Sequence, residues 1–276
     1  MGLVPLHQIG EPDLAASVAR DVERVGVSAA AGVIPLDEVR HLRTLVDDAL
    51  RKDARSCPPD REVDVGRVVF LPRYGREFLD LLDRDGVMAP CEEILGPDCT
   101  LYTMTTLCQP PHSAHRPLHV DTQYAVPGFI VWVGVMLMLD DFTMSSGPTR
   151  MHPDVTINAP EAADFEARAL RLEAPAGAAC WFHGRIWHDA LPNTTDHWRR
   201  AILIAMVRPW ARQRFDVARM VAHLDLSGLA PRVHRRLGFD HIPPGSYEEY
   251  YLPDSTRKAE LLRRALSSAS EGLPPT

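Results

Sequence analysis

The sequence predicts a mainly β protein, a sandwich or jelly roll, with helices covering it at both ends. From about residue 99 to 210, short β-prone runs alternate with turns rich in glycine and proline. Before and after this stretch, apolar residues recur at helical spacing instead. The 24 prolines of the chain also suit strand ends and loops better than a helical bundle. These observations favour one β core flanked by helical extensions.

Helical patterns dominate the first third of the chain. Pro35 suits the first turn of a helix, and the Asp37 carboxylate favours the same end. Gly96-Pro97 is a typical stop signal for the helix that precedes it. The expected elements are helices over residues 13–25, 36–51, 76–82 and 87–95, a surface loop over 52–66 and a short strand over 65–71.

Strand patterns take over after residue 99. The run 129–139 is almost entirely apolar, which predicts a strand buried on both faces. Residues 182–188 alternate in a way that favours a further strand leading into His188. Other expected elements are strands over 100–108, 149–151, 177–182 and 201–207, a partly helical insertion over 159–173, and helices over 215–224 and 255–266. The chain is predicted to be a single domain over residues 1–276, with its core at about 99–210 and helical cover at about 12–98 and 211–268.

Composition excludes some classes of function. A net charge of −7 and a pI near 5.9 argue against nucleic-acid binding, which needs a basic face. The longest apolar run is too short to span a membrane, and the N-terminus lacks a signal-peptide pattern. An odd number of cysteines without CxxC spacing predicts free thiols in a reducing cytoplasm. They are Cys57, Cys91, Cys99, Cys108 and Cys180. A cytoplasmic protein that acts on a small molecule is expected.

Metal-ligand residue types recur in the chain, and the His-x-Asp pattern occurs three times, starting at His119, His152 and His223. With 12 histidines, one such pair is expected by chance, so its surroundings must decide. His223 falls at the end of an expected helix and is interpreted as a surface residue. The second pair is interrupted by a proline, which favours a turn. The spacing also allows His152 and Asp154 to form a site with His197 and Arg208, but Arg208 would then lie at the end of a strand.

His119 and Asp121 have a more informative context. In a strand, residues i and i+2 point to the same face, so both side chains can reach one ion. A second histidine, His188, follows 69 residues later and leaves room for intervening strands. Two histidines and one carboxylate form the facial triad of non-haem Fe(II) oxygenases, which leaves coordination positions open. We therefore predict that His119, Asp121 and His188 bind iron and form the catalytic centre.

An arginine follows the second histidine at a suggestive distance. Arg199 lies eleven residues after His188, in front of the apolar run 201–207. Its planar guanidinium can bind a carboxylate through two parallel hydrogen bonds. Because side chains alternate along a strand, only one of Arg199 and Arg200 points inward. The spacing favours Arg199 as the group that binds the distal carboxylate of a dicarboxylate cosubstrate, and leaves Arg200 toward solvent.

Several short motifs occur in a specific order and spacing. They are Leu118–Asp121, Val135–Thr143, Ser146–Arg150 and Trp181–His188, followed by Asn193 and Arg199. In this order they resemble the phytanoyl-CoA dioxygenase-like (PhyH) family of Fe(II)/2-oxoglutarate oxygenases. The resemblance covers about residues 30–240 and is strongest from 100 to 210. It implies a double-stranded β-helix (jelly-roll, cupin-like) core, Fe(II) bound by the triad, 2-oxoglutarate bound by Arg199, and O2 as co-reactant.

Three motifs depart from the family's pattern. Ala190 stands where the family often has a small hydroxyl residue that helps to bind the cosubstrate. Ser146-Gly147 replaces the usual Asn-Gly, and His152-Pro153-Asp154 replaces Pro-Gly-Ser-His. A residue on strand 100–108 is expected to substitute for the missing hydroxyl, and Thr103 is our candidate. An ordinary strand threonine is the equally weighted alternative.

The resemblance implies oxidation of a small-molecule C–H bond coupled to decarboxylation of 2-oxoglutarate. Hydroxylation is the simplest outcome, and desaturation, ring closure and epoxidation share its start. Asp121 disfavours the halogenase variant, in which a smaller residue replaces that carboxylate. The breadth of the family suggests a tailoring step in natural-product biosynthesis. The alternatives are a metal-binding cupin-like isomerase, a non-catalytic small-molecule binding module, and a pseudo-enzyme with a defective cosubstrate pocket.

The substrate pocket has aromatic and cationic candidates, for each of which packing at the rim is the alternative. Their mixture favours a moderately polar, acidic small molecule. The candidates are His115, Gln123, Tyr124, Trp132, Arg185 and Trp187.

Overall fold

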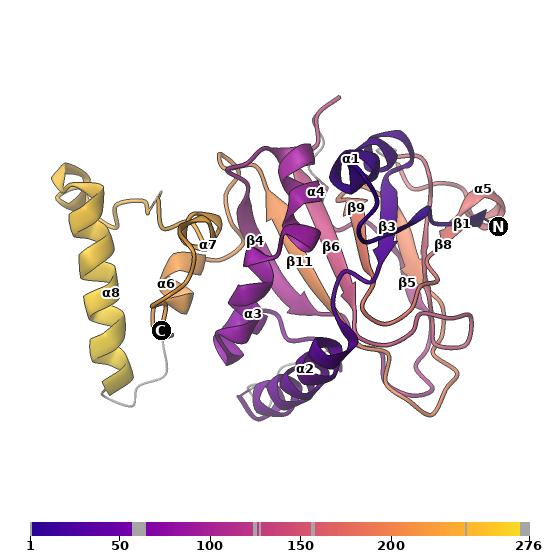
Figure 1. The fold of residues 1–276 in the computed structure, drawn as a ribbon, viewed down its shortest axis with the longest axis horizontal. Helices are drawn as coiled ribbons and strands as arrows, with labels where there is room; N and C mark the ends of the chain where they lie inside the picture. Colours follow the sequence, from indigo (N-terminus) through magenta and orange to yellow (C-terminus); the bar gives the residue numbers. More distant parts are fainter. Residues whose placement is uncertain are drawn as a thin grey trace.

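The computed structural model describes residues 2–56, 65–123, 126, 128–155, 158–240 and 242–270. Cys57 and Tyr124, which the sequence singled out, lie outside the described residues. Two β-sheets form the centre of the molecule, and helices surround one of them (Figure 1). The larger sheet has the order β2 (Leu6–Gln8), β3 (Val27–Ala31), β9 (Ala179–His183), β6 (Trp132–Met138), β11 (Ala201–Val207), β4 (Thr100–Thr106).

The smaller sheet carries the strands on which the predicted iron ligands lie. Its order is β1 (Gly2–Leu3), β8 (Leu170–Arg171), β7 (Thr149–Met151), β10 (His188–Ala190), β5 (Arg116–His119). Neighbouring strands run antiparallel except for the pairs β1–β8 and β2–β3, which are parallel. Two facing, mainly antiparallel sheets that exchange strands in this way are the double-stranded β-helix that the sequence predicts.

Two apolar clusters explain why the larger sheet is buried on both faces. Side chains such as Met136 and Leu203 belong to a cluster that also contains Met151 of the smaller sheet, so this cluster fills the space between the sheets. Their strand neighbours Val135 and Ile204 belong to the other cluster, together with helical residues. The strand within the predicted run 129–139 is therefore buried along its whole length, as its composition indicates.

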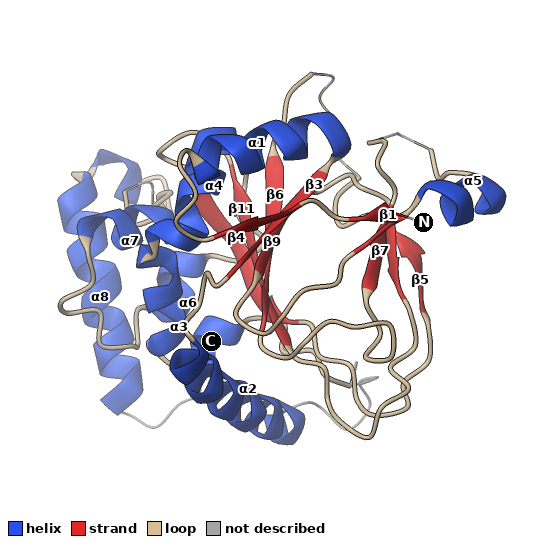
Figure 2. Ribbon diagram, turned by 45° about the vertical axis from the view of Figure 1, so that its right-hand side comes forward, coloured by secondary structure: helices blue, strands red, loops and turns tan. Residues whose placement is uncertain are grey.

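Helices cover the outer face of the larger sheet, away from the smaller sheet (Figure 2). An apolar stripe on the first of them buries Val18 and Val22 against this face. The N-terminal helices are α1 (Leu14–Val25), α2 (Leu36–Ser56), α3 (Glu77–Asp80) and α4 (Asp85–Leu95), with 3-10 helices η1 (Leu71–Tyr74) and η2 (Leu81–Asp83). α5 (Ala162–Arg168) lies within the predicted insertion.

The C-terminal part attaches to this helical layer through buried and paired arginines. Arg236 is almost fully buried, donates to the carbonyl oxygen of Leu82 and forms an ion pair with Glu92 of α4. Arg232 pairs with Asp83 and Asp85. The elements here are α6 (Val217–Val221), α7 (Pro231–Arg236), η3 (Glu249–Tyr251) and α8 (Asp254–Ser270). None of the described helices is long and apolar enough to cross a membrane.

Some predicted elements are wrong. Residues 65–71 contain no strand: Val68 instead accepts from and donates to Thr106 of β4, and η1 begins at Leu71. Residues 184–187, predicted as strand, form a turn between β9 and β10. The sequence also missed β3, whose small residues lack the alternation that marks a half-buried strand.

Candidate metal centre

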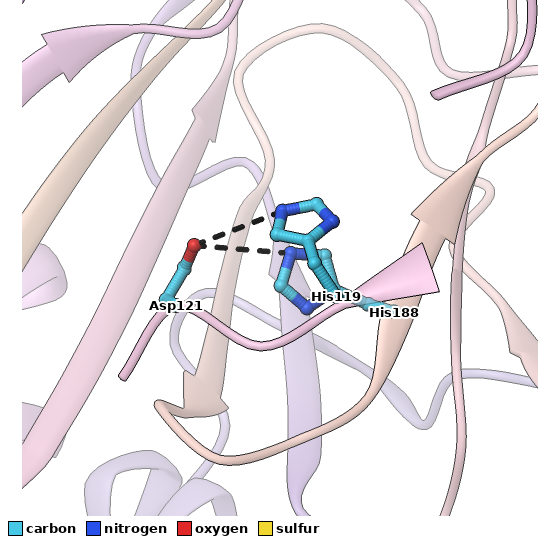
Figure 3. Close-up of side chains that lie close together, drawn as sticks. All are labelled: His119, Asp121 and His188. Atoms are coloured by element: carbon cyan, nitrogen blue, oxygen red, sulfur yellow. Dashed lines mark ion pairs between the residues drawn. The ribbon is translucent and has the colours of Figure 1, made fainter. Parts of the chain in front are cut away.

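His119, Asp121 and His188 come together at the end of the smaller sheet (Figure 3). His119 is the last residue of β5, and His188 is the first residue of β10 and its direct cross-strand partner. Asp121 follows β5 by two residues. The Nε2 atoms of both histidines lie 4.0 Å from Oδ1 of Asp121. One potential ligand atom from each residue lies within 4.8 Å of the other two, so a single ion can reach all three.

Backbone carbonyl groups fix both imidazole rings in the tautomer that a metal requires. Nδ1 of His119 lies 2.8 Å from the carbonyl oxygen of Pro117, and Nδ1 of His188 lies 3.0 Å from that of Ile186. A carbonyl oxygen only accepts, so each Nδ1 carries the hydrogen when the ring is neutral. Each Nε2 then presents its lone pair toward Asp121. Metal-binding histidines are commonly oriented in this way.

Electrostatics favour the neutral, ligating form of His119. Partial burial lowers its pKa first, and the nearby His188 lowers it further. The two rings are close, with centroids 4.2 Å apart. His188 is nearly buried, whereas the side chain of His119 is half exposed. The centre therefore has one protected side and one side that small molecules can approach.

The outer face of β10 anchors the strand that carries His188. Asp189 points away from the two sheets' interior and accepts two hydrogen bonds from Arg150, at 3.0 Å and 2.6 Å. Nε2 of His115 lies 2.8 Å from the same carboxylate. Asp189 and Arg150 are both buried, and paired, hydrogen-bonded charges of this kind fix geometry. The sequence analysis did not predict this anchor. The signal for it is an aspartate directly after a ligand histidine, because neighbouring side chains in a strand point to opposite faces.

The ring of Phe182 supports His188 from the larger sheet. Its centroid lies 5.9 Å from that of His188. The ring lies across Gly134, the cross-strand partner of Phe182 on β6. A Cβ atom on Gly134 would come within 2.3 Å of Cζ of Phe182. The absence of a side chain at Gly134 therefore leaves room for the ring beneath the candidate metal centre.

We expect Gly134→Ala to weaken metal binding. The added methyl group displaces the buried ring of Phe182 toward His188, and such overpacking costs about 1–3 kcal/mol. Isothermal titration with Fe(II) under anaerobic conditions, together with thermal unfolding, measures both effects. Adding Phe182→Leu, which removes the outer ring atoms, should restore part of the Fe(II) affinity. Unchanged affinity in the single variant would contradict this role of the ring.

Arg199 is a buried cation whose guanidinium is only partly hydrogen-bonded to the described residues. Nη1 donates to the carbonyl oxygen of Gly147 at 2.6 Å, and the group lies 4.3 Å from the ring centre of Phe142. Nη2 makes a long contact of 3.5 Å with the carbonyl oxygen of Leu107, and Nε has no partner in the described part of the chain. The Nε–Nη2 edge is the one that binds a carboxylate through two parallel bonds. Burial lowers the pKa of Arg199 to about 10, so it stays charged at neutral pH.

Arg200 points to the opposite face and is fully engaged there. It donates to both carboxylate oxygens of Asp47, at 2.7 Å and 3.1 Å, and pairs with Asp140 at 3.2 Å. Arg199 forms no ion pair with the described carboxylates. The alternation expected for the two arginines therefore holds, although Arg200 binds carboxylates of the helical cover and the sheet rather than water.

Thr103 lies on the inner face of the larger sheet. Its cross-strand partner is Ala205, which belongs to the cluster between the sheets. The register of β4 shifts beside it, and this bulge turns Tyr102 toward the same cluster. The hydroxyl of Thr103 donates to the carbonyl oxygen of Val69 at 3.2 Å. To bind a cosubstrate, it would have to give up that bond, and the role of Thr103 stays a prediction.

The other His-x-Asp pairs have different partners. Nε2 of His152 lies 2.9 Å from Asp164, and the ring stacks on Phe165. Asp154 forms an ion pair with Arg168. Asp225 is largely exposed. Among the described residues, only His119, Asp121 and His188 form a group of three potential metal ligands.

The predicted pocket residues differ in where they point. Trp132 belongs to the cluster between the sheets, and its ring centroid is 5.8 Å from that of Phe182. Its Nε1 has no partner among the residues that the structure describes. Arg185 is buried and donates to the carbonyl oxygen of Gln123 at 3.0 Å. His115 binds Asp189, as described above. Of these residues, Trp132 has a clear place inside the barrel.

Comparison with known proteins agrees with this geometry. The profile of the phytanoyl-CoA dioxygenase (PhyH) family matches residues 22–201, which is more than half of the chain. The chain belongs to the phytanoyl-CoA dioxygenase family. Two uncharacterized proteins, Mb1539 of Mycobacterium bovis and Rv1501 of Mycobacterium tuberculosis, are each 23% identical over 206 residues, covering 71% of this chain and 76% of theirs.

Two solved structures share the PhyH fold of this chain. AviO1 from Streptomyces viridochromogenes Tue57 has a TM-score of 0.59 at 20% identity, over 72% of this chain and 96% of its own. SnoK, described as a non-haem α-ketoglutarate-dependent carbocyclase from nogalamycin biosynthesis, also has a TM-score of 0.59 at 20% identity. That match covers 72% of this chain and 88% of SnoK.

PhyH family membership implies an oxygenase that uses Fe(II), 2-oxoglutarate and O2 and acts on a small molecule. The donor set fits this iron, because two neutral imidazoles and one carboxylate are the facial triad of non-haem Fe(II) enzymes. The Nε of Arg199, which has no partner among the described residues, fits a cosubstrate that ends in a carboxylate.

Proposed function

We propose that this PhyH protein is a dioxygenase that hydroxylates a C–H bond of a small molecule, as a tailoring step in natural-product biosynthesis in the cytoplasm. In this proposal His119, Asp121 and His188 bind Fe(II), and Arg199 binds 2-oxoglutarate. The observation that carries it is the convergence of two carbonyl-locked Nε2 atoms on the Asp121 carboxylate. The description of SnoK as a biosynthetic enzyme supports the tailoring role by likeness.

When bound, Fe(II) and 2-oxoglutarate supply the oxidising chemistry, with succinate and CO2 as products of the cosubstrate. The protein contributes position. Two backbone carbonyls orient the imidazoles. Asp189, which Arg150 anchors, fixes β10, the strand that carries His188. Arg199 would hold the far carboxylate of the cosubstrate. A held geometry of this kind is the main way in which an enzyme lowers the entropic cost of reaction.

The inner wall separates the chemistry from bulk water. His188 is nearly buried and lies next to the ring of Phe182, and the apolar cluster between the sheets closes the far side. Trp132 provides a hydrogen-bond donor inside this otherwise apolar wall. Because a buried donor without a partner costs free energy, an oxygen atom of the substrate is its natural acceptor. Excluding water strengthens electrostatic interactions inside the site and limits side reactions.

Anaerobic binding tests the proposal directly. The purified protein with Fe(II) and 2-oxoglutarate should develop a weak visible charge-transfer band, and candidate small molecules should then stimulate succinate formation in air. The same mixture with Zn(II) in place of Fe(II) serves as a control, since it gives no such band. If no band forms and no candidate stimulates succinate formation, a cupin-like isomerase or a binding module is the better description.

A further inference from the structure

Ala190 places a methyl group on the inner face of the smaller sheet, where the family often has a hydroxyl. It lies two residues after His188 and therefore points to the same side as this predicted iron ligand. Its methyl group cannot form the hydrogen bond that a serine or threonine at this position would offer a carboxylate. The cross-strand partners of Ala190 lie beside it in the sheet and are candidates to substitute for a hydroxyl.

Both cross-strand partners of Ala190 carry hydrogen-bond donors. On β7, its partner is Thr149, which is buried and whose hydroxyl forms no hydrogen bond with the described residues. On β5, its partner is Arg116, whose Nη2 donates to the carbonyl oxygen of Cys108 at 3.3 Å. Ala190 thus lies in a row between a hydroxyl and a guanidinium. Thr149 and Ala190 face the interior, because β7 and β10 pair in regular register. The pairing of β10 with β5 has a register shift between His188 and Ala190, so Arg116 is placed by its bond to Cys108 and by its charge near Arg199.

The same row lies next to Arg199. Nη1 of Arg199 binds the carbonyl oxygen of Gly147, two residues before Thr149. Nη2 of Arg199 lies against the carbonyl of Leu107, and Arg116 binds the carbonyl of the next residue, Cys108. The positive charge of Arg116 is also close enough to lower the pKa of Arg199. Two guanidinium groups that repel each other are stabilised by an anion that contacts both.

We propose that Arg116 and Thr149 bind the distal carboxylate of 2-oxoglutarate together with Arg199, in place of the hydroxyl that Ala190 lacks. This inference rests on the proposed function. Arg199 supplies its Nε–Nη2 edge, Arg116 supplies a second charge, and Thr149 supplies a neutral O–H donor. The distal carboxylate then meets two cations, so the pocket strongly favours a dicarboxylate over a 2-oxo acid that lacks this group.

A matched pair of ligands tests the inference. 2-Oxopentanoate has the five-carbon chain of 2-oxoglutarate without the distal carboxylate. Dissociation constants of both acids are measured from the charge-transfer band of the anaerobic Fe(II) protein, for wild type, Arg116→Gln and Thr149→Val. Arg168→Gln is the control arginine, because Arg168 lies on α5 and pairs with Asp154. Thermal unfolding of each metal-free variant shows whether it is folded.

We expect Arg116→Gln to lower the affinity for 2-oxoglutarate about 10-fold or more, as is usual for the loss of a charged hydrogen bond. Thr149→Val should lower it about 3- to 10-fold, as is usual for the loss of a neutral hydrogen bond. Neither variant should change the affinity for 2-oxopentanoate by more than about 2-fold. Introducing Ala190→Ser into the Thr149→Val background should restore 2-oxoglutarate affinity, because a serine hydroxyl then returns to the same row.

Two results overturn the inference. One is unchanged 2-oxoglutarate affinity in both variants, especially if Thr103→Val weakens it instead. The other is an equal loss of affinity for both acids, because that would place the effect at the metal end of the cosubstrate. If the wild-type protein itself gives no band, it is the proposed function that fails, and the inference falls with it.

Discussion

Replacing Asp121 with alanine should abolish the Fe(II)-dependent charge-transfer band and all substrate-dependent formation of succinate. The change removes the anionic member of the triad and leaves two imidazoles with no carboxylate between them. Loss of a residue that only supports a ligand typically costs 10–100-fold in metal affinity, so loss of the ligand should raise the Fe(II) dissociation constant by more than ~100-fold. Calorimetric titration with Fe(II) measures the affinity, and a coupled assay measures succinate.

The chain supplies a matched control for this variant. Asp154→Ala removes the carboxylate of a second His-x-Asp pair, whose histidine binds Asp164 instead. This control should keep wild-type iron affinity. Asp121 makes no hydrogen bond to the described residues that the fold would lose, so the metal-free Asp121→Ala protein should unfold near the wild-type temperature. Full retention of succinate formation in Asp121→Ala would refute the triad.

Arg199→Met should raise the dissociation constant of 2-oxoglutarate by at least ~100-fold. Two charge-assisted hydrogen bonds to a carboxylate contribute about 1.5–3 kcal/mol each, and each 1.4 kcal/mol is tenfold in affinity. Methionine keeps much of the side-chain length and removes a buried charge, so the fold should survive. The anaerobic charge-transfer titration gives the 2-oxoglutarate affinity, while Fe(II) affinity without cosubstrate should stay within about 2-fold of wild type.

Arg200→Met separates this effect from a general loss of positive charge. The neighbouring arginine points outward and binds Asp47 and Asp140. Its loss should lower the unfolding temperature and leave 2-oxoglutarate affinity unchanged. A similar loss of cosubstrate affinity in both variants would argue against a specific role for Arg199.

Residue order predicts the β core well because the signals there are local. The strand over residues 201–207 has the predicted bounds. Its seven apolar residues lie between a charged segment and a segment that contains proline, and these flanks mark where the buried element begins and ends. The strand pattern around His119 and Asp121, together with the residues that follow in order, predicts that they lie near His188. Placing them within ligand distance depends on the pairing of β5 with β10, which a period-2 pattern cannot specify.

The parts that the sequence missed depend on contacts between distant segments. β3 forms because its small residues fit between β2 and β9, not because of their own preferences. The turn over 184–187 interrupts an alternating pattern because β9 and β10 belong to different sheets. The pairing of Ala190 with Arg116 and Thr149 likewise requires knowledge of strand register. The sequence therefore directed attention to Thr103, on the opposite sheet, as the substitute for a hydroxyl.

The two backbone carbonyls that lock the histidines have a consequence for the life of the protein in a cell. Pro117 and Ile186 keep two lone pairs directed at a carboxylate whether or not a cation is present. A ligand that binds only the folded state stabilises it, by about 2.7 kcal/mol at 100 times its dissociation constant. Differences of this size change cellular abundance several-fold through degradation of unfolded chains. When iron is scarce, the cell should therefore hold less of this protein, even at an unchanged rate of synthesis.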